Sequence, residues 1–239
     1  MRRLAALALI AAAASACSGG SSSSQPAGPC GNPYQPSAAG TRWQYRTTSA
    51  TGTFSAIDTV TSSSSTGFAV TSRSRTASSV LHYRCSAAGI AALDVAGVAG
   101  TVTGSQIHHA FTTASMSGVT LPPSPAGKTW RQTFQVHGSG EVDGASEALT
   151  GTVAITFTAA TDRTGLIVPA GRFRVLPVSE VTVFRLVVTV RGVTVPVRTV
   201  VRTTADLAPG VGLVRSVSTG NLLGAQLGSQ TVLMSSHAH

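Results

Sequence analysis

Alternation of apolar and polar residues dominates this chain, and the pattern is clearest between Thr164 and Val217. A repeat of two predicts half-buried β-strands, and the abundance of valine and threonine disfavours a helix. The segments Val181–Arg191 and Val193–Arg202 are predicted to form a hairpin around Gly192. Pro196 lacks a backbone N–H, so the second strand is expected at a sheet edge or beside a bulge.

The two faces of the first strand of this hairpin differ in polarity. Phe184, Leu186 and Val188 share one face, whereas Arg185 lies on the other. Because successive side chains of a strand point to opposite sides, the apolar set is predicted to face inward. These three residues are therefore the candidates for a surface that contacts an apolar ligand.

Similar short segments, separated by turn residues, recur along the rest of the chain and predict an all-β fold. The further strand candidates are Arg42–Thr48, Ala56–Thr61, Phe68–Arg75, Val80–Cys85, Gly89–Leu93, Gln106–Thr112, Thr129–His137 and Thr152–Thr158.

Two of these strands open with an internal echo. Gln35–Trp43 reads QPSAAGTRW and Pro122–Trp130 reads PPSPAGKTW, so each has a proline-rich turn, then Ala-Gly, then tryptophan. The echo indicates one β domain over residues 30–234 with two sheet-forming halves, which begin near Tyr34 and near Leu121. Two small domains are the alternative.

The start of the chain has the pattern of a lipoprotein signal peptide over residues 1–16. A basic beginning is followed by an apolar run, Leu4–Ala14, which is too short to span a bilayer. Small residues directly precede Cys17, whose thiol is then predicted to carry lipid; an ordinary signal peptide with an incidental Cys17 is the alternative. Residues 17–29 are predicted to form a lipidated, flexible linker, and residues 235–239 a frayed tail.

Lipidation of Cys17 leaves Cys30 and Cys85 as an even pair. Exported proteins fold in an oxidising compartment, where disulfides form. We therefore predict a Cys30–Cys85 disulfide, with two free thiols or an intermolecular bridge as alternatives. The predicted location is the bacterial cell envelope, where the chain is lipid-anchored on the periplasmic or extracellular side.

Charge narrows the range of partners. The formal net charge is +9, and removal of residues 1–16 takes away Arg2 and Arg3 and leaves +7. The basic residues form no stripe interleaved with aromatics, so nucleic acid is not an expected partner. Anionic lipid headgroups or cell-wall polymers are the candidate partners. The alternative is a solvated outer face whose arginine stems cover apolar surface.

Candidate catalytic or metal-binding residues do not form a recognisable set. His108 and His109 are adjacent, so on a strand they would point to opposite faces, and His237 and His239 lie in the expected tail. A GxSxG motif is absent from the sequence. We therefore predict no catalytic residues, no cofactor and no metal site.

Two turn motifs carry a family resemblance: Val168–Phe173 (VPAGRF) and Ala208–Val214 (APGVGLV), preceded by the GxxW segments Gly40–Trp43 and Gly127–Trp130. In this order they resemble a broad group of bacterial lipoproteins and secreted proteins. That group is similar to lipoprotein-carrier folds. The resemblance implies a curved antiparallel sheet forming an open or half β-barrel with an apolar concave side, and offers no catalytic residues to carry over. A β-sandwich is the alternative arrangement.

The functional expectation is a lipid-anchored, non-catalytic envelope protein that binds an apolar or amphipathic ligand, or an envelope partner, on the concave sheet face. Two alternatives remain: a structural or interaction module with a filled core, and a hydrolase with dispersed residues. A cavity favours the binding protein, and a filled core favours the module. A pocket that joins a histidine to a carboxylate or serine favours the hydrolase.

Overall fold

The computed structural model describes residues 30–50, 52–75, 77–95, 110–142, 145–222 and 225–237. Most of these residues are in β-strands, and none of them is in a helix. The strands are β1 (Arg42–Ser49), β2 (Gly52–Ser63), β3 (Gly67–Ser74), β4 (Ser78–Ser86), β5 (Gly89–Ala92), β6 (Ala110–Gly118), β7 (Thr129–Val142), β8 (Ala145–Ala159), β9 (Thr164–Val168), β10 (Gly171–Val190), β11 (Val193–Ala208), β12 (Gly212–Leu222) and β13 (Ala225–His237). None of the described segments is a helix long and apolar enough to cross a membrane.

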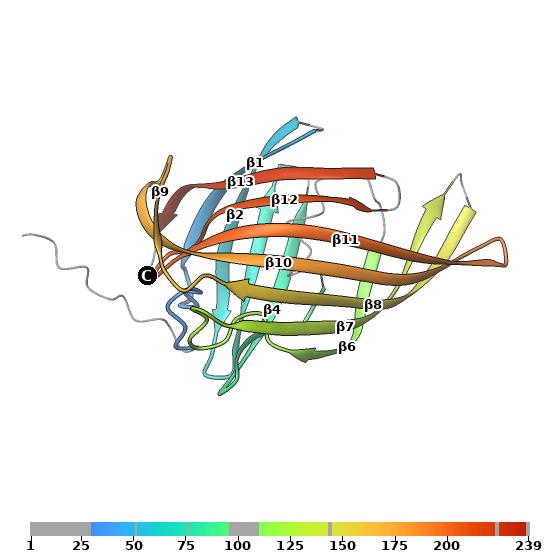
Figure 1. Ribbon diagram of the computed structural model, residues 1–239, viewed down its shortest axis with the longest axis horizontal. Helices are drawn as coiled ribbons and strands as arrows, with labels where there is room; N and C mark the ends of the chain where they lie inside the picture. Colours follow the sequence, from blue (N-terminus) through green and yellow to red (C-terminus); the bar gives the residue numbers. More distant parts are fainter. Residues whose placement is uncertain are drawn as a thin grey trace, which may run out of the picture.

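The strands form one antiparallel sheet in the order β5-β4-β3-β2-β1-β13-β12-β11-β10-β8-β7-β6, and β9 pairs with the first part of β10. The sheet curls until its two edges approach one another (Figure 1). An isolated bridge between Ile90 of β5 and Leu121, just after β6, joins these edges. The fold is therefore an antiparallel barrel with one seam, which confirms the predicted all-β class and curved sheet.

Side chains hold the seam together where a continuous backbone ladder is missing. The backbone N–H of Val95 donates to Oγ1 of Thr113 at 2.9 Å, and that of Ala92 donates to Oγ1 of Thr120 at 2.8 Å. The buried amide of Gln132 donates to the carbonyl of Ala92 at 2.7 Å and accepts a hydrogen bond from the Thr120 hydroxyl. Buried backbone groups need such partners, so these polar side chains allow the barrel to close.

The β10–β11 hairpin turns at Gly192, as the sequence predicts. β12 pairs with β11 only from Val201 to Ala208, so in the described pairings Pro196 has a neighbouring strand on one side, at Val187. The position is a local sheet edge, which is where a residue without an N–H is tolerated. β13 continues to His237, three residues into the segment expected to fray.

Candidate functional site

The two echoing segments build the same turn twice. Gly40 and Gly127 have φ of 88° and 70°, in the left-handed region that favours glycine. The N–H of Gly40 donates to the carbonyl of Val60 at 2.9 Å, and that of Gly127 donates to the carbonyl of Ala160 at 3.0 Å. Each glycine thus ties the start of one strand to the end of the next, at the same end of the barrel.

Each turn is followed by a tryptophan whose N–H is held by a backbone carbonyl. Trp43 on β1 donates from Nε1 to the carbonyl of Val211 at 2.6 Å, and Trp130 on β7 donates to that of Thr120 at 2.9 Å. Trp130 also stacks on Phe157, with ring centroids 5.4 Å apart. Because the polar edge of each indole is satisfied, the apolar faces can line the interior.

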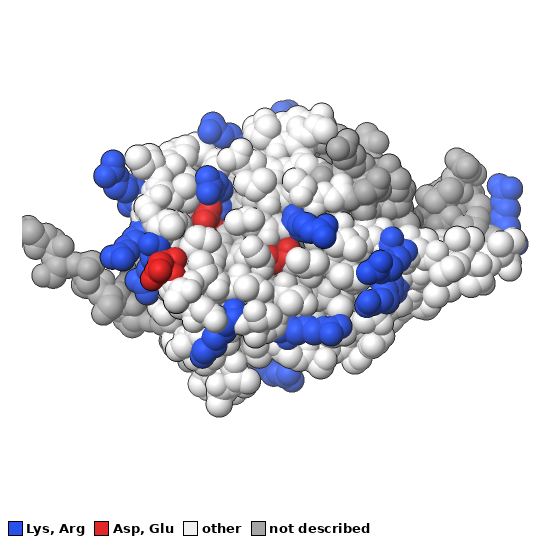
Figure 2. All heavy atoms as spheres, in the orientation of Figure 1, with Lys and Arg blue, Asp and Glu red and all other residues white. Residues whose placement is uncertain are grey.

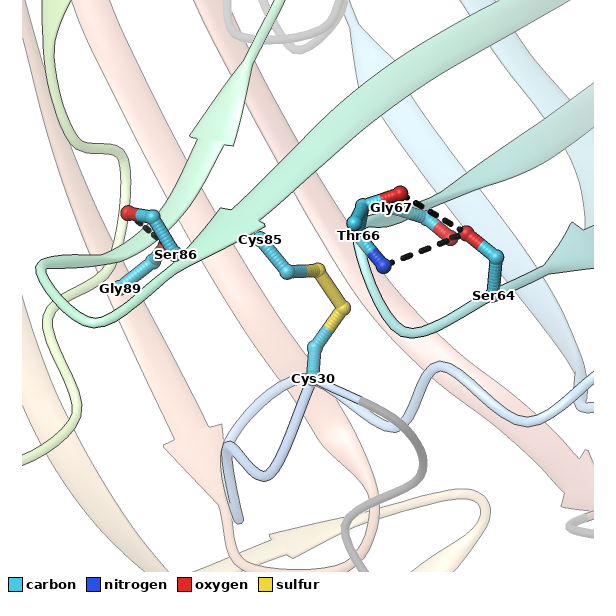
Figure 3. Close-up of a disulfide and its surroundings, with 7 residues drawn as sticks. All are labelled: Cys30, Ser64, Thr66, Gly67, Cys85, Ser86 and Gly89. Carbon is cyan, nitrogen blue, oxygen red and sulfur yellow. Dashed lines mark hydrogen bonds between the residues drawn. A yellow bond between two sulfur atoms is a disulfide. The ribbon is translucent and has the colours of Figure 1, made fainter.

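A disulfide pins the segment before β1 to this end of the barrel. Cys30 is bonded to Cys85 on β4, with 5.5 Å between their Cα atoms, which confirms the predicted pair (Figure 3). Cys85 lies beside the turn that joins β2 to β3: its N–H donates to the carbonyl of Thr66 at 2.8 Å, and Ser64 caps the same turn through the Thr66 N–H at 3.3 Å.

The segment 30–41 crosses the end of the barrel, and we call it the plug. The plug is held by the side chain of Asn32, which donates to the carbonyl of Pro122 at 3.0 Å. It is also held by the Ala208–Val214 turn, where Gly210 donates its N–H to the carbonyl of Pro33 at 2.7 Å. The Ala208–Val214 motif therefore has a structural role, because it holds the plug across this end of the barrel.

Behind the plug lies a cavity of about 1040 Å³ inside the barrel. All three tyrosines and both tryptophans of the chain line it: Tyr34, Trp43, Tyr45, Tyr83 and Trp130. Phe54 and Phe157 complete an aromatic wall in a chain in which aromatics make up 5% of residues. Phe54 is 42% exposed, and the other six of these aromatic side chains are buried or half-buried.

The cavity opens at the end opposite the plug. The lining residues that are exposed to solvent lie near two turns. They are Thr53, Phe54 and Ser55 at the β1–β2 turn and Arg75, Ala77 and Ser79 at the β3–β4 turn. The buried Tyr34 and Trp43 lie at the plug end. The site therefore has an aromatic floor and a mouth of small and hydroxyl side chains, with Phe54 and Arg75 as its two large residues.

Two carboxyl groups face the cavity, and sequence reasoning did not single out either of them. Asp58 on β2 is hydrogen-bonded by the Ser72 hydroxyl, while its buried Oδ1 has no partner among the described residues. Glu180 on β10 accepts a hydrogen bond from Thr182 Oγ1 at 3.0 Å. Burial raises the pKa of Asp58 above its usual range and that of Glu180 to about 7.

The tyrosines beside Asp58 are neutral hydrogen-bonding groups. Burial, and secondarily the Asp58 carboxyl, raises the pKa of Tyr45 and of Tyr83 well above its ordinary value. Tyr45 donates its hydroxyl to the carbonyl of Leu213 at 3.2 Å, and Tyr83 stacks on Phe68 with ring centroids 4.6 Å apart. Both rings are therefore fixed in place on the cavity wall.

The residues proposed from sequence as ligand contacts lie elsewhere in the interior. Phe184, Leu186 and Val188 are 3%, 2% and 7% exposed and belong to the packed core, but they do not line the cavity. The part of β10 that lines it is Val178 and Glu180, on the same face and nearer the start of the strand. The geometry thus moves the candidate contacts along β10, because the interior beyond Glu180 is packed.

The proposed lipidation site, Cys17, lies outside the described residues. No group of three histidine, cysteine, aspartate or glutamate residues lies together in the described parts of the chain. The described lining of the cavity contains carboxyl groups and serines but no histidine.

The outer surface differs sharply in charge from the interior. Every described lysine and arginine is exposed except the half-exposed Arg215, which forms an ion pair with Asp206 at 2.8 Å. Figure 2 shows basic residues spread over one face of the barrel, with few acidic ones. Arg185 and Arg198 lie directly opposite one another on β10 and β11. Such a like-charge pair is tolerated because both side chains reach solvent.

Two crystal structures of bacterial proteins are similar to this chain. A candidate lipoprotein from Parabacteroides distasonis has a TM-score of 0.55 and 15% identity, over 86% of this chain and 99% of the other. A candidate exported protein with a YmcC-like fold from Bacteroides fragilis has a TM-score of 0.48 and 17% identity, over 84% and 96%. At such identity the first likeness shows a shared fold.

No protein-family model matches the chain, and a search of curated proteins found no match. Membership in the group suggested by the VPAGRF and APGVGLV turns therefore stays a prediction.

Proposed function

We propose that this protein is a lipid-anchored, non-catalytic component of the bacterial cell envelope that holds an apolar or amphipathic ligand inside its barrel. The observation that carries the proposal is the aromatic cavity of about 1040 Å³ with its mouth at one end. Binding sites for small molecules typically enclose about 300–1,000 Å³ and are lined mainly by apolar and aromatic side chains.

Packing energetics also support an occupant. Leu81, Trp130 and Leu213 line the cavity and are only half-buried, so part of each side chain borders open space instead of close-packed neighbours. Apolar walls that lack contacts forfeit dispersion energy. A ligand with an apolar body would restore those contacts.

The anchor and the envelope location rest on the sequence. The small residues before Cys17 and the serine-rich linker after it support lipidation. The arginine-rich outer face supports contact with anionic envelope components such as lipid headgroups or cell-wall polymers.

Native mass spectrometry of the mature protein, extracted gently from membranes, tests ligand binding. We expect a non-covalent adduct in addition to the lipid on Cys17. Ala205→Phe should lose the adduct, because Ala205 lines the cavity. Thr204→Phe should keep it, because Thr204 is exposed on the opposite face of β11. Absence of an adduct, together with no binding of added amphiphiles, would contradict the proposal and favour a structural module.

A further inference from the structure

The two cavity carboxyl groups lie on different walls of the barrel. Asp58 is on β2 and Glu180 on β10, with β1, β13, β12 and β11 between them in the sheet. In the strand ladders Asp58 is directly opposite Trp43 and Ser72, and Glu180 is directly opposite Phe157. Each carboxyl therefore has an aromatic residue and a hydroxyl group as neighbours.

No basic residue among those described offsets these carboxyl groups. Arg75 is the one cation in the described lining, and it is exposed at the mouth. Arg163 approaches the plug end, where its Nε donates to the Tyr34 hydroxyl at 3.0 Å and its guanidinium lies 5.5 Å from the ring centroid. The Arg215–Asp206 ion pair lies on the outer face of the barrel. Among the described residues, the two carboxyl groups of the interior therefore have no counter-ion when they are ionised.

Asp58 has the features of a cation-binding group. Among the described residues its buried Oδ1 has no hydrogen-bond partner, and Tyr45 and Tyr83 are close enough for its charge to affect their ionisation. Cations bind favourably over aromatic faces and beside carboxylates. A ligand with an anionic headgroup at this position would be repelled by two carboxyl groups. A ligand with an uncharged headgroup would leave the buried charge of the Asp58 carboxylate without a counter-ion.

We infer that the ligand held in the barrel is a cationic amphiphile, with an amine or quaternary ammonium head beside Asp58 and an apolar body against the tryptophans and tyrosines. Glu180 adds a second carboxyl on the facing wall. The inference rests on the proposed function and names the chemical class of its ligand.

Binding of such a cation depends on pH in a direction set by the site. In the empty cavity, burial raises the pKa of both Asp58 and Glu180, so a proton competes with the cation. The titratable groups that interact with Asp58 among the described residues are the neutral Tyr45 and Tyr83, and the hydroxyl of Ser72 donates a hydrogen bond to it. Affinity for the cation should therefore rise with pH, by up to about tenfold per unit below the carboxyl pKa.

The test compares three probes with the same ten-carbon chain, decyltrimethylammonium, decanol and decanoate, by calorimetry on the full mature chain below their micelle concentrations. We expect decyltrimethylammonium to bind at least about tenfold more tightly than decanoate and more tightly than decanol. Asp58→Asn should remove this preference and leave decanol binding intact. Asp162→Asn makes the same charge change at an exposed residue and should preserve the preference.

Each outcome separates the inference from the proposed function. Equal affinity for the three probes, or tighter binding of decanoate, overturns the cationic ligand and leaves the proposed function standing. Failure of all three to bind overturns both. If Asp58→Asn does not fold, the pH series on the unchanged protein decides. Affinity for decyltrimethylammonium that rises between pH 4 and 8, while that for decanol stays constant, supports the inference. Constant affinity for both overturns it.

Discussion

Trp43 and Trp130 occupy equivalent positions in two copies of one turn-and-strand unit, and both indole rings line the same cavity. In each copy a glycine N–H ties the turn to the end of the second strand after it, β2 or β8, and a backbone carbonyl holds the indole N–H. The sequence echo therefore marks the part of the fold that builds the site.

The interior is hollow on one side and packed on the other, and substitutions of two leucines should therefore differ in their effect on stability. Leu186 is 2% exposed in the packed core, whereas Leu81 is half-buried on the cavity wall. Leu186→Ala should lower the free energy of unfolding by about 2–5 kcal/mol because it opens a new void. Leu81→Ala should cost less than about 2 kcal/mol, since it enlarges an existing space. Urea unfolding followed by circular dichroism measures both, and equal losses would argue against a hollow interior.

The disulfide should contribute strongly to stability because it closes a long loop. Cys30 and Cys85 are 55 residues apart in sequence, for which the chain-entropy model gives about 4 kcal/mol. Replacing both by serine should lower the unfolding midpoint in urea. In the unreduced, mature protein, thiol titration should find neither residue free. Two reactive thiols there would contradict the structure.

Glu180 should make stability depend on pH. Its pKa is raised to about 7 in the folded protein from an ordinary value of 4.5, so between these values the folded state binds the proton more tightly. Stability should therefore fall as pH rises through this window and level off above it, with a total loss of up to about 3 kcal/mol from this group.

The variant Glu180→Gln removes that titration. Its stability relative to the unchanged protein should increase from pH 4.5 to pH 8, as measured by urea unfolding at several pH values. Asp58 titrates in both proteins and cancels in the comparison. Parallel pH profiles for the two proteins would show that Glu180 is not held in an apolar environment.

Membrane association should depend on Cys17. Cys17→Ser removes the thiol that carries lipid, and the protein should move from the membrane fraction to the soluble exported fraction. Fractionation followed by a carbonate wash checks this. A variant that remains with the membrane after the wash would refute the lipid anchor.

Much of the fold can be predicted from the sequence because a period of two specifies which side chains share a face. That pattern correctly separated the buried Phe184 and Leu186 from the exposed Arg185. It could not show how deep in the barrel each residue lies, because depth depends on which strands meet across the interior. The packed region around Leu186 and the cavity at Val178 are therefore indistinguishable in the sequence.

The carboxyl groups of the site were missed for a related reason. Asp58 and Glu180 are far apart in the chain, and each stands alone among serine, threonine and valine without a motif. They share a cavity only because the sheet closes at the seam between β5 and β6. The alternating pattern did contain a signal, since both are acidic residues at inward positions of their strands.

The central claim, that an amphiphile occupies the aromatic cavity, is tested most directly by contact quenching. Trp43 and Trp130 are the two tryptophans of the chain, and both line the cavity. A brominated decanol quenches tryptophan emission at contact. The account predicts saturable quenching that unbrominated decanol reverses, that Ala205→Phe abolishes and that Thr204→Phe retains. Quenching that never saturates, or that Ala205→Phe leaves unchanged, would contradict it.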